Sequence, residues 1–435
     1  MSYEDRPDDG ASGAAASAPT RWIWIVLVLA VCHAAAVASF QILSVLVDPI
    51  KVALGVTDVQ YGLIQGVAIA IFASLLGIPA ASVADRGNRR LVVLVGVIAW
   101  SAATLTAASV QSFTELFAAR MVVGLGEVFL YPSALSMIAD VAPRGRLSSA
   151  IGAFGCGGPI GAALALIGGG WLVHHRQPLV AMLPGLPAWR AAFLLCGALG
   201  LLAAALLLTV SEPQHREIGE RAGIEATLRY MGGRWRLFAG VSAGMLALSF
   251  CVFATASWSP AMLVRDHGMS YGGAGAITGS AALVGGVVGA WTCGLLSDWV
   301  ESRGRRDAVL QVSVAVSICF LLSMAAGVIA SSSRWTATFV WVSYALLGMP
   351  TVLGGTALQQ ISPPPMRAQV MALQVLLVNL FALSLGPLTV PWLADDIFDN
   401  PQSIGSALAL TVGAGAIVAA FASLLCRQRF RRERI

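Results

Sequence analysis

Two stretches of this chain repeat one another: residues 55–66 read GVTDVQYGLIQG, and residues 268–279 read GMSYGGAGAITG. A turn glycine, a hydroxyl residue, an isoleucine and two further glycines match in type at one constant offset, without a gap. Each copy continues through apolar residues to an acidic residue and a group of arginines, DRGNRR at 85–90 and DWVESRGRR at 298–306. Internal repeats in a long apolar chain are typical of secondary transporters built from two related halves. The repeat therefore predicts a duplicated membrane bundle.

The composition excludes an ordinary soluble domain. Of the 435 residues, 57% are hydrophobic and 11% are charged, whereas about a quarter of a soluble domain is charged. Apolar runs of about 20 residues, the length that crosses a bilayer, occur six times before the polar stretch 211–235 and six times after it. The sequence predicts an all-α polytopic membrane protein with twelve transmembrane helices in two six-helix bundles. The expected parts are a disordered tail over 1–21, a bundle over 22–210, a linker over 211–235, a bundle over 236–425 and a basic tail over 426–435.

The positive charges indicate the orientation of the chain. With both termini in the cytoplasm, 21 of the 27 basic residues fall on the inner side and five on the outer side. This bias follows the positive-inside rule, so we expect cytoplasmic termini. The arginines are spread along one set of loops, which argues against a nucleic-acid footprint. A single lysine among these basic residues is typical of a GC-rich bacterial genome, and we expect a protein of the bacterial cytoplasmic (inner) membrane.

Ionisable groups within the spans are candidates for function, because a charge at membrane depth costs about 2.5 to 3.5 kcal/mol on insertion scales. Arg120 and Glu127 lie seven residues apart on the fourth expected span, which places them on one helix face, roughly 10.5 Å apart along the axis. Burial raises the pKa of a carboxylate and a nearby arginine lowers it, and this opposition is what a proton-coupled site requires. A static buried ion pair is the alternative. His33, near the middle of the first span, is a second proton-coupling candidate, or a packing residue.

Other polar side chains expected at depth are candidates to line a substrate cavity. They are Ser39, Gln41, Gln65, Tyr131, Trp258, Tyr344, Thr356, Gln359, Gln374 and Asn379. Charged residues at the expected inner ends of the spans are candidates for gating. They are Asp85, Arg86, Arg89, Arg90, Asp140, Asp298, Arg305 and Arg306.

For the gating group we expect contacts that form in one conformation and break in another. Asp85 can face a helix N-terminus, and Arg89 or Arg90 can reach Asp140 at the end of the fourth span. The arginines could instead reflect orientation alone.

Enzymatic chemistry has no support in the sequence. There is no GxxxxGK[ST] loop, no metal-ligand cluster and no nucleophile elbow, so we expect no ATP hydrolysis, no cofactor, no metal and no enzyme activity. The expected partners are a small-molecule or lipid substrate, protons and membrane lipids, and no nucleic acid. We expect the protein to be a monomer.

Three motifs resemble those of the Major Facilitator Superfamily, over essentially the whole chain. Residues 81–90, ASVADRGNRR, are similar to the signature Gly-x-Leu-x-Asp-Arg-x-Gly-Arg-Arg, with Ala81 and Asn88 in place of two glycines. Arg120-x-x-x-Gly124-x-Gly126 resembles the span-four motif, and Gly158-Pro159-Ile-Gly161 resembles part of the span-five motif of its antiporters.

Within that superfamily the chain looks most like spinster-type transporters. The segments that carry this likeness are Gly62–Gln65, Arg120–Glu127, Ile138–Asp140, Trp189–Arg190, Glu212–Pro213 and Arg367 to Pro387. The resemblance implies a proton-linked carrier of amphiphilic lipids such as lysophospholipids, with Glu127 and Arg120 as the span-four pair. Where that family carries Asp-Arg-Tyr on span one, this chain has Ser39-Phe40-Gln41.

The leading hypothesis is a secondary transporter that works by alternating access and takes up protons at Glu127. A carrier of small polar organic solutes is the second hypothesis. A membrane sensor or receptor that does not transport is the third, from a different class of function.

Overall fold

The structure is a computed structural model that describes residues 18–76, 87–143, 145–175, 185–213, 223–330, 332–400 and 402–434. The side chains of residues 18–20 and of Glu127 lie outside this description. Within these ranges the chain forms helices and no strands. Twelve helical segments there are long and apolar enough to cross a membrane, which confirms the predicted fold class.

The first half contains six spans. Its elements are α1 (Ala18–Gln41), η1 (Ile42–Val45), α2 (Val47–Leu54), α3 (Asp58–Gly62), η2 (Leu63–Val67), α5 (Arg89–Ala107), α6 (Phe113–Val141), α7 (Leu147–Gly155), α8 (Gly157–His174) and α10 (Ala188–Leu208). The first span joins α1 to η1, the second runs over Asp58–Leu76, and the fifth joins α7 to α8.

The second half contains the other six. Its elements are α11 (Ile224–Gly233), α12 (Trp235–Arg265), α13 (Tyr271–Ser280), η3 (Ala281–Gly285), α14 (Gly286–Ser302), α15 (Ala308–Ile329), α16 (Ser333–Leu347), α17 (Met349–Ile361), η4 (Pro364–Met366), α18 (Arg367–Leu377), η5 (Val378–Leu383), α19 (Ser384–Trp392), η6 (Leu393–Ile397) and α20 (Ile404–Glu433). The eighth span joins α13, η3 and α14, and the eleventh runs over Pro364–Ile397.

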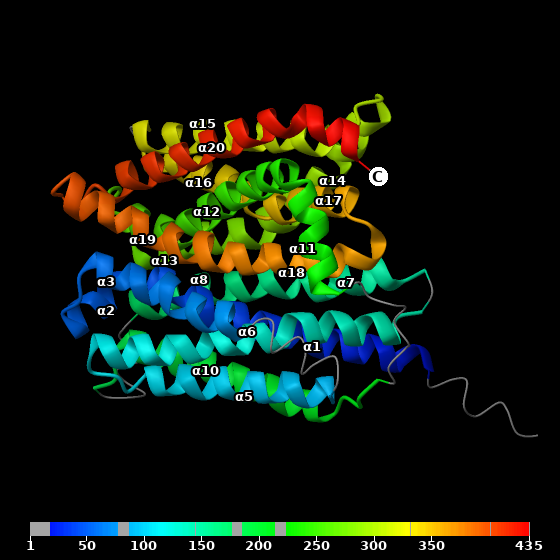
Figure 1. The fold of residues 1–435 in the computed structure, drawn as a ribbon. Coiled ribbons are helices and arrows are strands. Elements are labelled where there is room, and N and C mark those ends of the chain that lie inside the picture. Colours follow the sequence, from blue (N-terminus) through cyan, green and yellow to red (C-terminus); the bar gives the residue numbers. More distant parts are fainter. Residues whose placement is uncertain are drawn as a thin grey trace, which may run out of the picture.

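The two halves lie side by side with their helices roughly along a common direction (Figure 1). Helix α1 begins and α20 ends at the same end of the molecule, which we call the termini end; α2 and α3 lie at the opposite end (Figure 1). Helix α20 continues to Glu433, so much of the expected basic tail is helical. The described part of the linker forms α11, whose Tyr230 hydroxyl donates to the Ile361 carbonyl, 3.1 Å away, in the second half.

The repeat in the sequence marks two equivalent helix starts. Gly55 and Gly268 have φ values of 64° and 62°, a left-handed conformation that glycine adopts without strain. Thr57 then caps α3 in a capping box with Gln60, and the Ser270 hydroxyl caps α13 by accepting from the Gly273 N–H. The matching hydroxyl residues are therefore helix N-caps, which satisfy N–H groups that the first turn leaves unpaired.

Candidate functional site

The two helix glycines of each repeat lie where one half meets the other. A Cβ on Gly62 would lie 2.8 Å from the Pro387 carbonyl oxygen, and one on Gly66 would lie 2.5 Å from that of Leu383. The second span is thus packed backbone to backbone against the eleventh. Small residues permit such close approach between membrane helices.

The second copy makes the equivalent contact between the eighth and fifth spans. A Cβ on Gly275 would collide with the Leu166 carbonyl oxygen, and one on Gly279 would lie 2.6 Å from Ile167 Cγ1. Both glycine contacts lie in the parts of the spans next to the end opposite the termini, where α3 and α13 begin. The halves are therefore closed against each other at this end.

Charged residues join the halves at the same end, in a group that we call the cross-half cluster: Asp48, Lys51, Asp58, Arg265 and Tyr271. Arg265, at the end of α12, has Nη2 2.5 Å from Asp48 Oδ1 and 2.9 Å from Asp58 Oδ1. Asp58 is buried and also pairs with Lys51 at 2.5 Å. The Tyr271 hydroxyl donates to Asp48 Oδ2 at 3.2 Å. One arginine of the second half thus holds two carboxylates of the first.

A polar seam also crosses between the halves. Gln41 Nε2 donates to the Ala256 carbonyl at 2.8 Å and to Ser44 Oγ at 3.0 Å, and Gln65 Nε2 lies 3.5 Å from the same hydroxyl. Gln65 Oε1 is buried and has no hydrogen-bond partner in the described part of the protein. Because buried polar atoms are nearly always satisfied, this oxygen is a candidate contact for a substrate. On the eleventh span, Gln374 Nε2 is likewise buried and has no hydrogen-bond partner among the described residues.

Arg120 supports a break in the first span. Its side chain is 1% exposed, and Nη1 donates to the Ser39 carbonyl at 2.7 Å, with Nη2 3.5 Å from that of Phe40. These carbonyls belong to the last turn of α1, where the chain tightens into the 3₁₀ turn η1. A helix C-terminus carries unpaired carbonyls and partial negative charge, so the guanidinium stabilises it. Glu127 lies two turns further along α6, with its side chain outside the description.

His33 lies where the fifth span is interrupted. Its ring stacks on Phe154 at 4.8 Å between centroids and meets Tyr131 edge-on at 5.7 Å, and Nδ1 is 3.2 Å from the Phe154 carbonyl oxygen. Phe154 lies in the last turn of α7, which ends at Gly155, just before the Gly157–Gly158 start of α8. His33 is half-buried in this aromatic group, and its proton role stays a prediction.

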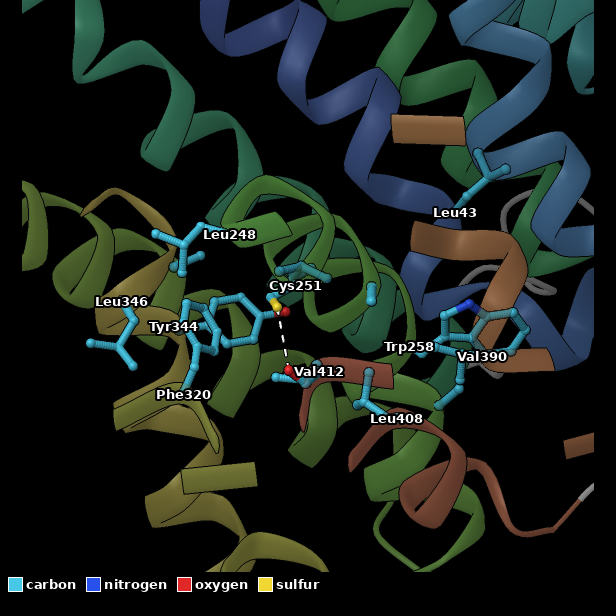
Figure 2. Packing of buried hydrophobic residues seen from close by; sticks show 14 of the residues in the cluster. Leu43, Leu248, Cys251, Trp258, Phe320, Tyr344, Leu346, Val390, Leu408 and Val412 are labelled. Atoms are coloured by element: carbon cyan, nitrogen blue, oxygen red, sulfur yellow. Dashed lines mark hydrogen bonds between the residues drawn. The ribbon is translucent and has the colours of Figure 1, made fainter. Parts of the chain in front are cut away.

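The remaining predicted cavity residues differ in exposure. Ser39, Trp258, Tyr344 and Gln374 are buried, Thr356 and Asn379 are half-buried, and Gln359 and Tyr131 are exposed. Figure 2 shows Tyr344 beside Phe320 in the packed interior of the second half. The Trp258 indole N–H donates to the Pro387 carbonyl at 2.7 Å. In this conformation these two aromatic residues belong to the packed core.

At the termini end, Arg89 joins three spans of the first half. It is 1% exposed, forms ion pairs with Asp140 and, at 3.0 Å, with Glu212, and donates to the Pro213 carbonyl at 3.0 Å. The predicted contact between Arg89 and Asp140 is therefore present. Arg90 instead donates to the carbonyls at the end of α10. Asp85 and Arg86 lie outside the described residues.

Comparisons with known proteins agree with this architecture of two halves. The family model of the Major Facilitator Superfamily matches residues 29–387. The chain belongs to the Major Facilitator Superfamily. It is an integral multi-pass membrane transporter, in a superfamily whose members are not enzymes.

Its relatives include both efflux and spinster proteins. The chain is 30% identical over 397 residues to an MFS-type efflux pump of Mycolicibacterium smegmatis, covering 90% of this chain and 89% of that protein. It is 28% identical over 374 residues to protein spinster homolog 3 of Danio rerio, covering 79% and 70%. A bacterial homolog of the human lysosomal transporter spinster, in an inward-facing and unoccupied conformation, shares the fold with a TM-score of 0.80 at 22% identity, covering 95% and 98%.

The acid and arginine motif of the second half makes different ion pairs from the motif of the first half. Asp298, Arg305 and Arg306 are exposed and make no ion pair within the described ranges. The acid that joins helices here is Asp307, which is fully buried before α15 and pairs with Arg427 at 2.6 Å and Arg431 at 2.7 Å on α20. Relative to the first half, where Arg89 meets Glu212, the signs of the charges are reversed.

The pKa of Asp307 reflects this environment. Burial alone would raise the pKa, but hydrogen bonds from Arg431, Arg427 and Gln311 outweigh it and lower the pKa to about 2. Because the folded pKa is below the unfolded value near 3.9, the stabilisation is complete above pH ~4 and is lost as the pH falls through about 2.

Replacing Asp307 with asparagine should therefore lower the melting temperature of the detergent-purified transporter at pH 7. The variant should also lose less melting temperature than the unmodified protein as the pH falls below 4. The lost stabilisation is at most about 2 kcal/mol, because solvent screens the partly exposed arginines. Asp298→Asn removes an equal charge from an exposed site and should leave the pH profile unchanged. Identical profiles for both variants would contradict the assignment.

Sequence reasoning missed the cross-half cluster and Asp307 of this transporter. Arg265 contributes only to the count of basic residues on the outer side, and neither Asp48 nor Asp58 is among the candidate residues. One signal in the sequence pointed to the cluster. The expected outer side of the chain carries few basic residues, and two of them, Lys51 in the first half and Arg265 in the second, have acidic residues near them in the sequence. The two carboxylate partners of Arg265, however, lie more than 200 residues away from it in the chain.

Proposed function

We propose that this transporter moves a small organic or amphiphilic, lysolipid-like substrate by alternating access between its halves. The observation that carries the proposal is the one-sided closure. The glycine contacts and the cross-half cluster join the halves at one end, whereas the ion pairs described above at the termini end join residues of one half. Two halves that close at one end at a time are the basis of alternating access.

The distribution of charge supports an inward-facing assignment for this conformation. By the positive-inside rule the termini end, with its many arginines, faces the cytoplasm. The closed end then faces outward, and a substrate would enter or leave between the halves from the cytoplasmic side.

An amphiphilic substrate is supported by the resemblance of the sequence motifs to those of spinster-type carriers. Small polar organic solutes are the second candidate, favoured by the unsatisfied amide atoms of Gln65 and Gln374, which could bind a polar group. Transport of a lysolipid panel and of a small-metabolite panel into proteoliposomes, each at two imposed pH gradients, distinguishes the two. Uptake of metabolites alone would overturn the amphiphile proposal.

Proton coupling is proposed at Glu127, two turns along α6 from the buried Arg120. Glu127→Gln should reduce gradient-driven transport in proteoliposomes at least tenfold, because an amide cannot carry the proton, while substrate counterflow continues. Glu115→Gln, in the exposed first turn of the same helix, is the matched control and should transport normally. Gradient-driven transport that survives in Glu127→Gln would exclude this role.

A further inference from the structure

A hollow at the termini end of the second half is lined by arginines. Its walls are Arg303, Gly304, Arg305, Arg306 and Arg431, around a space that is open to solvent. Gly304 has φ 78°, and this left-handed turn, closed by its N–H donating to the Glu301 carbonyl at 2.8 Å, reverses the chain between α14 and α15. The turn thereby places arginines on both sides of the hollow.

Two of these arginines have their charge available for a ligand. Arg431 pairs with Asp307, and Arg303 lies over the Trp299 ring, 3.3 Å from its centroid. Arg305 and Arg306 are exposed and have no acidic partner among the residues that the structure describes. Two of the nearby acids are already engaged, Asp307 with α20 and Glu301 with Arg434, and neither they nor Asp298 lines the hollow. The hollow therefore carries an excess of positive charge.

An exposed apolar stripe leads along α14 to this hollow. Val288, Trp291, Leu295 and Trp299 repeat at helical spacing and are 47%, 69%, 51% and 53% exposed. In a spanning helix such a face lies against the acyl chains, and tryptophan near its end is typical of the headgroup level. Arg303 follows Trp299 by four residues, and Arg305 and Arg306 follow it by six and seven. Helix α14 and the end of α20 lie together at the termini end (Figure 1).

We propose that the arginine hollow binds the phosphate headgroup of an anionic membrane lipid, whose acyl chains lie along the α14 stripe. Guanidinium groups bind phosphate oxygens in pairs of charge-assisted hydrogen bonds. The continuous apolar face favours a lipid over a free phosphate, because only a lipid also covers exposed Leu295 and the two tryptophans. The site is separate from the seam between the halves, so it holds a lipid that is not transported.

Binding to the full chain in detergent can be measured by native mass spectrometry and thermal shift. The probes are phosphatidylglycerol, phosphatidylcholine and soluble glycerol 3-phosphate. Phosphatidylglycerol should bind at least tenfold more tightly than the other two. The double variant Arg305→Gln/Arg306→Gln should lose most of this preference, because it removes the two uncommitted charges and leaves the Arg431–Asp307 pair in place.

The matched control is Arg429→Gln/Arg432→Gln, which removes two charges from exposed positions of α20 outside the hollow. It should bind phosphatidylglycerol as the unmodified protein does, and both variants should elute as monodisperse protein. Equal losses in the two double variants would show general charge attraction and overturn the site. Soluble glycerol phosphate that binds as tightly as the lipid would overturn the lipid as its ligand.

Discussion

Replacing Arg265 with leucine should open the end of the transporter that lies opposite the termini. The guanidinium holds Asp48 and the buried Asp58 across the halves, and removing one partner of a buried ion pair costs about 3 to 5 kcal/mol. That penalty falls only on the conformation closed at this end, since the carboxylates regain water when the halves separate. This range corresponds to a shift of roughly 100- to 4,000-fold toward the open state, and we expect correspondingly weak transport.

Spin labels on Val52 and Ile397, exposed positions of the two halves at this end, report the change by double electron–electron resonance. The exposed Cys156 and Cys319 are first replaced by serine. Arg265→Leu should lengthen the distance between the labels. Lys51→Met is the matched control, because the ion pair of Lys51 in the described part of the protein is with Asp58 inside the first half, so the Arg265 contacts across the halves stay in place. Unchanged distances in Arg265→Leu would refute the role of the cross-half cluster.

The second large effect is expected at Arg89, and it concerns stability. Arg89→Leu should lower the melting temperature in detergent by roughly 10 °C, as expected for a loss of about 3 to 5 kcal/mol in a bundle of this size. The side chain joins Asp140, Glu212 and the Pro213 carbonyl, so one substitution releases the ends of the third, fourth and sixth spans together.

Two further variants test whether the contacts themselves matter. Arg89→Lys should recover part of the stability, since an ammonium keeps the charge but cannot reach all of these acceptors at once. Arg146→Gln removes an arginine from an exposed position at the same end and should change the melting temperature by less than about 2 °C. A melting temperature for Arg89→Leu equal to that of Arg146→Gln would contradict the structural assignment.

The repeat shows how far local signals reach. Gly55 with Thr57, and Gly268 with Ser270, specify a turn and a helix start through their own backbone and hydroxyl chemistry, so the sequence predicts both. The matching helix glycines predict close packing between helices, but the sequence does not identify the helix against which each glycine packs. Gly66 approaches Leu383, which is over 300 residues away in the chain, because the two halves pack side by side.

The acid and arginine motif that follows each repeat does not make the same contacts in the two halves. The motif after each repeat carries an acid and arginines, and the contact of Arg89 with Asp140 could be anticipated because both lie at span ends of one bundle. In the second half the exposed Asp298 takes no such part, and Asp307 pairs with α20 instead. The nearest opposite charge decides the pairing, and that depends on how the ninth and twelfth spans pack.

The sequence by itself determined twelve spans, their division into two halves and the superfamily, because apolar length, turn glycines and short motifs act locally or through the membrane. The tertiary structure decided that Arg120 caps the broken end of α1, that Arg265 holds two carboxylates of the other half, and that four arginines surround one hollow. Each of these depends on groups far apart in the chain, and a charge or a carbonyl selects its partner by distance and burial after the helices have packed.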